Sequence, residues 1–124
     1  MNRIVIVDDV EDNRDFLFYA LNERFEVIGY SNGEDALSRL HTDRPSVVIL
    51  DLSLPDINGF EVLRRIREQP EFESMPVIAL TAHAMAGDRE KCMAAGFTDY
   101  ISKPILDLDE FTNCIEAYCA QSHK

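Results

Sequence analysis

The stretch VVILDLSLPDING, residues 47–59, joins four apolar residues to a carboxylate and then to a turn. A continuous run of β-branched and aliphatic side chains is typical of a strand buried on both faces, as in a parallel sheet. Asp51 ends this run, and Pro55 and Gly59 follow at a spacing that predicts a turn. The stretch therefore predicts a buried strand with an acid at its carboxyl end, which is either a solvated loop residue or a reactive group.

Apolar segments recur along the chain, and helical patterns separate them. The segments are IVIV at 4–7, FEVIGY at 25–30, VVIL at 47–50, VIAL at 77–80 and the shorter DYIS at 99–102. A strict alternation of strands and helices predicts parallel strands, right-handed crossovers and helices on both faces of the sheet. We therefore expect an α/β fold with a doubly wound five-stranded parallel sheet, and we assume the flavodoxin-like order 2-1-3-4-5.

The helical segments carry recognisable start and stop signals. Start signals stand at 31–33 and 58–59, and a helix from about Ala86 to Ala95 ends before Gly96. The final helix has an apolar face, and Asp107 is its predicted N-cap. One helix has a charged face that we expect to be solvated, and its residues are Glu61, Arg64, Arg65, Arg67 and Glu68, with Glu61 and Arg65 as an i,i+4 pair.

Composition limits the kinds of partner and compartment. The 124 residues suit one domain spanning 1–124, and a formal net charge of -11 argues against binding to nucleic acid or to anionic membranes. No apolar run approaches the roughly 20 residues that span a bilayer, and the N-terminus is no signal peptide, so we expect a cytoplasmic protein. Cys92, Cys114 and Cys119 lack metal-site or disulfide spacing and are interpreted as reduced structural thiols, with a redox role for one of them as the alternative.

Acids, a hydroxyl and a lysine follow the strands at their carboxyl ends, which meet at one edge of a parallel sheet. They are Asp8 and Asp9 after the first strand, Asp51 after the third, Thr81 after the fourth and Lys103 after the fifth. Three close carboxylates repel one another unless a cation is present, and Mg²⁺ is typically held by carboxylates, waters and phosphate oxygens. A carboxylate can also accept a phosphoryl group, whose charge Mg²⁺ and the Lys103 ammonium would neutralise.

The residues around these positions also resemble a known family. Over essentially its whole length the chain resembles the receiver domain of bacterial two-component response regulators. The motifs that carry the resemblance are IVIVDDVEDNR, ILDLSLPDINGFEVLRRIR and VIALTAHAMAGDREKCMAAGFTDYISKPI, in the family's order and spacing. Each motif alone is weak, because it reads equally well as a loop, cap or turn, whereas Asp-Asp, Asp, Thr and Lys-Pro together at strand ends are specific.

The resemblance implies a metal-assisted phosphoacceptor site. Asp51 would accept a phosphoryl group from a histidine kinase or from the histidine of a phosphotransfer protein. Asp8 and Asp9 would hold Mg²⁺ together with Asp51 and the backbone carbonyl of Ser53. Ser53 and His83 occupy positions that tune the lifetime of the phosphate in the family.

The resemblance also implies a response to phosphorylation. Thr81 would contact the phosphoryl group, Lys103 would pair with the acceptor, and the peptide bond before Pro104 would be cis. Tyr100 matches the family's switch aromatic, although a tyrosine on a short edge strand also needs no function beyond the core. The surface formed by the fourth helix, the fifth strand and the fifth helix would then bind a downstream protein effector.

The expected function is a phosphorylation switch that assists its own phosphorylation and dephosphorylation, and not an enzyme for an external substrate. Its output surface would include parts of 84–95 and 105–118, and the chain is either a stand-alone regulator or a receiver fragment of a hybrid kinase or larger regulator. A rival is a Mg²⁺-dependent phosphatase with Asp51 as nucleophile, but such enzymes carry a second acid where this chain has Ser53. A degenerate receiver that only binds partners would have lost the acid pair, Asp51 or Lys103.

Overall fold

The structure, a computed structural model that describes residues 2–82 and 85–122, contains one five-stranded parallel sheet. The strand order is β2-β1-β3-β4-β5, which confirms the expected α/β fold and the assumed order. The strands are β1 (Arg3–Val7), β2 (Glu26–Tyr30), β3 (Val47–Asp51), β4 (Val77–Thr81) and β5 (Asp99–Ser102). Each strand begins and ends within one residue of its predicted bounds.

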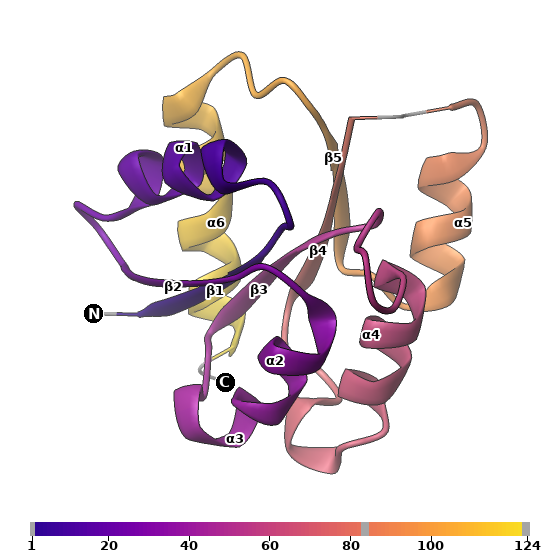
Figure 1. The fold of residues 1–124 in the computed structure, drawn as a ribbon. Helices are drawn as coiled ribbons and strands as arrows, with labels where there is room; N and C mark the ends of the chain where they lie inside the picture. The colour runs from indigo at the N-terminus through magenta and orange to yellow at the C-terminus, as the bar shows by residue number, and fades with distance from the viewer. Residues whose placement is uncertain (1, 83–84, 123–124) are drawn as a thin grey trace.

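Helices cover both faces of the sheet, with α1 and α6 on one face and α2, α4 and α5 on the other (Figure 1). Their bounds are α1 (Glu11–Leu21), α2 (Gly33–Ser38), α3 (Leu40–Asp43), α4 (Gly59–Arg67), the 3₁₀ turn η1 (Pro70–Phe72), α5 (Asp88–Ala95) and α6 (Leu108–Ser122). The Asp107 carboxylate accepts a hydrogen bond from the Glu110 amide at 3.0 Å, which confirms the predicted cap of α6. None of the helices among the described residues is long and apolar enough to cross a membrane.

The segment after β2 differs from the single helix that the start signal at 31–33 predicts. It forms two short helices, α2 and α3, which meet at Arg39. Arg39 has φ −102° and ψ 0°, and its amide is shared between the carbonyls of Asp35 and Ala36, each at 3.3 Å, so the end of α2 tightens toward 3₁₀ geometry. Ala36 of α2 and Leu40 of α3 are nevertheless both buried in the core, so an apolar face continues across the break.

Two apolar layers flank the sheet because successive strand residues point to opposite faces. Val48 and Leu50 pack beneath α2, α4 and α5, whereas Val47 and Ile49 pack against α1 and α6. All four side chains are at most 1% exposed. The apolar run of β3 is therefore buried on both faces, as its composition predicts, and it forms a rigid support for Asp51.

Arg67 corrects the prediction that the charged face of α4 is solvated throughout. Its guanidinium is half-buried and donates to the carbonyls of Phe72 at 3.0 Å, Met75 at 2.6 Å and Gly96 at 3.0 Å. Burial lowers the pKa of Arg67. The side chain thus joins α4 to the turn after η1 and to the end of α5, which a periodicity argument on α4 alone does not reveal.

Replacing Arg67 with Met removes these donors and keeps an apolar stem. We expect the free energy of unfolding to fall by about 2–3 kcal/mol, because carbonyls that a charged donor satisfies are left without it. Urea unfolding measures the change. The matched control is Arg64→Met, which removes exposed pairs to Glu61 and Glu68 and is expected to change stability little. Equal losses in the two variants would contradict this account of Arg67.

Candidate phosphoacceptor and metal site

Three carboxylates gather at the carboxyl edge of the sheet because β1 and β3 are neighbours in it. Asp8 directly follows β1 and is 1% exposed, and Asp51 ends β3 and is 7% exposed. Asp9 lies beside them and is exposed. Each of the three offers a carboxylate oxygen within 4.8 Å of the others. The structure thus brings together the three acids that the sequence placed at strand ends.

Lys103 joins two of these acids across the pocket. Its ammonium donates to Asp8 Oδ2 at 2.9 Å and lies 3.3 Å from Asp51 Oδ2. The Lys103 amide donates to the Thr81 carbonyl at 2.8 Å, and the peptide bond between Lys103 and Pro104 is cis. Backbone pairing beside β4 therefore aims the lysine side chain at the acids from the opposite side of the pocket.

The charges of the pocket shift the pKa values of Asp51 and Lys103. Burial raises the pKa of Asp51; the Ser53 amide and the Lys103 charge oppose this shift, but the pKa stays above its ordinary value. Burial alone would lower the pKa of Lys103, but the hydrogen bond to Asp8 and the charge of Asp51 outweigh it and raise that pKa. Lys103 is consequently held in its charged form, and further positive charge beside Asp51 would lower the pKa of Asp51 again.

The loop after β3 holds Asp51 in a fixed orientation. Asp51 Oδ1 accepts the Ser53 amide at 2.9 Å, and the Gly59 amide donates to the Leu52 carbonyl at 3.2 Å. A Cβ atom at Gly59 would lie 2.9 Å from the Asp51 carbonyl oxygen, so a larger residue there would displace the loop. The Asn58 side chain caps α4 by accepting the Glu61 amide at 3.0 Å.

Two residues near the site were missed by sequence reasoning. Arg14 on α1 donates to the Asp8 carbonyl at 2.8 Å and so fixes the loop after β1. Asp56, in the loop between β3 and α4, accepts the amides of Gly33 and Glu34 at 3.0 and 2.8 Å. Neither contact has a local sequence signal, because each joins segments that only the fold brings together.

The donor set fits a hard divalent cation. Carboxylate and carbonyl oxygens are the ligands that Mg²⁺ prefers, and two oxygens on opposite sides of an octahedral Mg²⁺ are about 4.2 Å apart. The Asp8, Asp9 and Asp51 oxygens, within 4.8 Å of one another, need only a small contraction or a bridging water to reach that spacing. Ser53 is exposed in the adjoining loop, and its carbonyl is the further ligand that the family resemblance implies.

Thr81 and Tyr100 lie in different surroundings. Thr81 ends β4, is 4% exposed, and follows Leu80, which pairs in register with Asp51. Tyr100 on β5 packs against the core beneath α4 and α5. Its hydroxyl is buried and has no hydrogen-bond partner among the described residues.

His83 and His123 lie outside the described residues, and His41 is exposed and pairs with Glu71.

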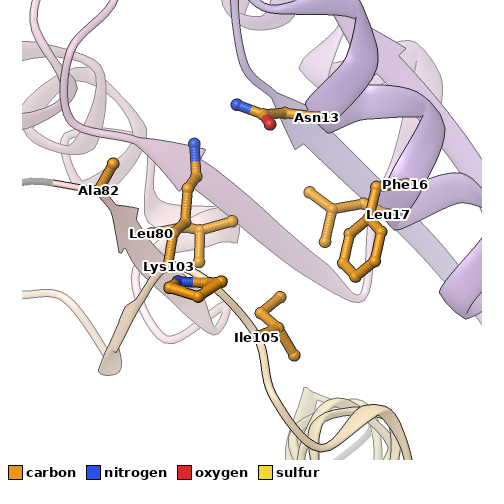
Figure 2. A pocket seen from close by; sticks show the side chains of 8 residues that line it. Asn13, Phe16, Leu17, Leu80, Ala82, Lys103 and Ile105 are labelled. Atoms are coloured by element: carbon orange, nitrogen blue, oxygen red, sulfur yellow. The ribbon is translucent and has the colours of Figure 1, made fainter.

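An apolar cavity of about 620 Å³ opens beside the acidic pocket. Figure 2 shows Asn13, Phe16 and Leu17 of α1 on one side of it and Leu80, Lys103 and Ile105 on the other. Lys103 belongs to both the cavity wall and the acidic pocket. A group bound in the cavity would therefore lie next to the carboxylates.

Comparison with known proteins identifies the family. The sequence pattern of the response regulator receiver domain matches residues 4–116. The chain belongs to this family. It is therefore a receiver domain of the kind found in two-component systems.

Several relatives share most of the receiver's length. The polar-differentiation response regulator DivK of Brucella anthropi is 38% identical over 117 residues, which cover 93% of this chain and 94% of DivK. The phosphate regulon regulatory protein PhoB of Rhizobium meliloti is 40% identical over 103 residues, 82% of this chain and 45% of PhoB. The receiver domain of a Pseudomonas aeruginosa sensor histidine kinase, solved with magnesium coordinated in its active-site cleft, has a TM-score of 0.85 and 30% identity, covering 96% of this chain and 98% of that one.

Addition of Mg²⁺ is expected to stabilise the receiver. At a concentration of 100 times the dissociation constant, a ligand that binds only the folded state adds about 2.7 kcal/mol to the free energy of unfolding. Thermal unfolding in Mg²⁺, with potassium chloride at the same ionic strength as control, measures the gain. Asp9→Asn should reduce it. Equal melting temperatures of the unmodified chain in the two salts would contradict the assignment of a metal site.

The raised pKa of Asp51 predicts a pH-dependent effect of Asp51→Asn in metal-free buffer. The folded state binds the Asp51 proton more tightly than the unfolded chain, so ionisation costs stability once the pH exceeds the raised pKa. The Asn variant should therefore be more stable than the unmodified receiver at neutral pH. This advantage should shrink as the pH falls through the raised value to the ordinary pKa of aspartate. Urea unfolding as a function of pH measures it, and an advantage that grew on acidification would refute the prediction.

Proposed function

We propose that this receiver accepts a phosphoryl group on Asp51 and that the modified domain signals through protein contacts. The observation that carries the proposal is the Lys103 ammonium, which lies between Asp8 and Asp51 in a pocket of three carboxylates. A nucleophilic carboxylate, a fixed cation and a metal-binding acid pair are the groups that phosphoryl transfer requires. The magnesium-containing relative supports the metal assignment.

The residues of the pocket suit each part of the transfer. A carboxylate oxygen of Asp51 attacks phosphorus, the bond from phosphorus to the histidine nitrogen of the donor breaks, and its electron pair remains on the imidazole. Lys103 stays charged and neutralises an oxygen of the transferred group, and Thr81, one residue beyond the partner of Asp51 in β4, donates its hydroxyl to another. Bound Mg²⁺ would neutralise further charge on the transferred group.

The donor we propose is a histidine kinase or a histidine phosphotransfer protein. Phe16 and Leu108 are 44% and 43% exposed, and Leu106 is 90% exposed. Phe16 lines the apolar cavity, as do Lys103 and Ile105. Leu106 and Leu108 come shortly after Ile105 in the sequence. A protein donor with an apolar surface around its histidine would bury these side chains while presenting phosphorus to Asp51.

The output surface we propose comprises α5, β5 and α6. Tyr100 lies on β5 with its hydroxyl buried beneath α5 and without a partner among the described residues. A movement of Thr81 toward a phosphoryl group would change the packing available to this ring, and with it the exposed surface that an effector protein meets. On this proposal the receiver is a switch and not an enzyme for an external substrate, and its cytoplasmic location remains a prediction.

A phosphatase acting on a small substrate is less well supported. Such an enzyme needs a free acid beside the nucleophile for general acid-base catalysis. Ser53 stands two residues after Asp51, the neighbouring acid Asp8 is bonded to Lys103, and Asp9, the third acid of the cluster, would be taken up by the cation. The pocket therefore suits acceptance of a phosphoryl group better than repeated turnover.

Acetyl phosphate with Mg²⁺ is expected to add one phosphoryl group to the unmodified receiver and none to Asp51→Asn. Intact-mass spectrometry under mildly acidic conditions, which preserve the acyl phosphate, measures the product. Omission of Mg²⁺ should slow the reaction markedly, because the pocket then holds only Lys103 against the incoming charge. The same mass gain in Asp51→Asn would refute the proposed acceptor.

Thr81→Ala tests the proposed path from phosphate to output surface. The variant should still be phosphorylated, because Asp51 and Lys103 remain, but it should lose most of the spectral change at α5 and β5. Amide NMR spectra of both proteins, with and without phosphorylation, measure this change, and Thr81→Ser should restore it through the retained hydroxyl. Full changes at Tyr100 in phosphorylated Thr81→Ala would disprove the role of the hydroxyl.

A further inference from the structure

We infer that Asp56 is a positioning residue for the cation site, because it holds the loop between β3 and α4 against α2. This inference rests on the proposed function, since it assumes that the Ser53 carbonyl in this loop is a metal ligand. Asp56 itself is exposed and lies beyond the pocket, three residues after Ser53. Its role would be to fix the backbone and not to touch the ion.

The contact is made by both oxygens of one carboxylate. Asp56 Oδ1 accepts the Gly33 amide at 3.0 Å, and Asp56 Oδ2 accepts the Glu34 amide at 2.8 Å. These amides, together with that of Ile57, lower the pKa of Asp56 although burial opposes the shift, so the side chain accepts both bonds as an ionised carboxylate. Such charge-assisted bonds to two consecutive amides fix the direction of the side chain as well as its position.

The loop between β3 and α4 packs directly on α2, so the hydrogen bonds of Asp56 can fix the position of the loop backbone. A Cβ atom at Gly33 would lie 2.9 Å from Ile57 Cγ1 and 2.6 Å from Val62 Cγ2, so α2 and the loop are in direct contact. The first anchor of this loop is the Ser53 amide, which donates to the Asp51 carboxylate at 2.9 Å. Asp56 supplies the second anchor, on the other side of Ser53 and toward a different element.

Two anchors on either side of Ser53 restrict where its carbonyl can point. Without Asp56, the segment from Ser53 to Asn58 would lose its bonds to α2 and would be held only at Asp51 and Gly59, so the bond from the Ser53 amide to Asp51 would open more often. The three carboxylates would stay in place, because they belong to the turn after β1 and to the end of β3. Loss of Asp56 should therefore weaken cation binding while leaving the acidic cluster in place.

Removing Asp56 also removes a negative charge, which by itself weakens cation binding. Glu34 offers a matched control, because its carboxylate pairs with Arg65 at 3.0 Å while its amide is one of the two that Asp56 binds. Glu34→Gln removes the same charge from the same region and leaves the Asp56 contact unchanged. Asp56→Asn supplies a second variant, which removes the charge but keeps one carbonyl acceptor.

The experiment is a Mg²⁺ titration of the full chain, followed by amide NMR at constant ionic strength. Asp56→Ala should raise the dissociation constant about tenfold, as loss of an outer-shell partner typically does. Glu34→Gln should change it by less than about twofold, because exposed charges at this range are screened, and Asp56→Asn should fall between them. In metal-free buffer, the amides of Gly33, Glu34 and Ser53 should exchange with solvent faster in Asp56→Ala than in the unmodified chain.

The possible failures are distinguishable. If the unmodified chain binds Mg²⁺ and Asp56→Ala binds it as tightly as Glu34→Gln does, the positioning role is overturned and the proposed function stands. Unchanged exchange of the three amides in Asp56→Ala would overturn it as well. If the unmodified chain shows no Mg²⁺-dependent shifts, the proposed metal-dependent function is contradicted, and the inference falls with it.

Discussion

The ammonium of Lys103, between Asp8 and Asp51, is the interaction on which the site depends. Two buried carboxylates and a third exposed one share a small volume, and their mutual repulsion must be offset for the edge of the sheet to remain packed. One lysine offsets part of this charge and leaves a net negative pocket. On the proposed function, that residual charge would attract a divalent cation, and the bound cation would in turn offset the charge of an incoming phosphoryl group.

The sheet supplies the rigidity that this electrostatic balance needs. The adjacency of β1 and β3 determines the separation of Asp8 and Asp51, and the buried run Val47–Leu50 leaves the strand no freedom to relieve repulsion by shifting. Separate hydrogen bonds hold the loops that follow β1 and β3. Arg14 binds the carbonyl of Asp8, and Asp56 binds two amides of α2. Strand pairing thus places the acids, and polar contacts from neighbouring helices set the backbone between them.

Much of the fold and of the site could be predicted from the sequence because the decisive signals are local. A continuous apolar run such as Val47–Leu50 indicates a strand buried on both sides, and an acid directly after it must lie at the carboxyl edge. The strand order was assumed from the fold type, and the structure confirms it. Arg67 and Asp56 could not be predicted, because their partners, at Gly96 and Gly33, are distant in sequence and are backbone groups with no side-chain signal. The break at Arg39 was missed for a related reason, since Leu40 keeps the helical spacing across it.

The most direct test of the central claim is a crystal structure of the receiver with Mg²⁺ and beryllofluoride, a stable mimic of an aspartyl phosphate. The account predicts beryllium bonded to a carboxylate oxygen of Asp51, with Thr81 and Lys103 contacting its fluorines. It also predicts a cation held by Asp8, Asp9, Asp51 and the Ser53 carbonyl. A complex without an adduct, or with the adduct or the cation bound elsewhere, would contradict the claim that this edge of the sheet is a phosphoacceptor site.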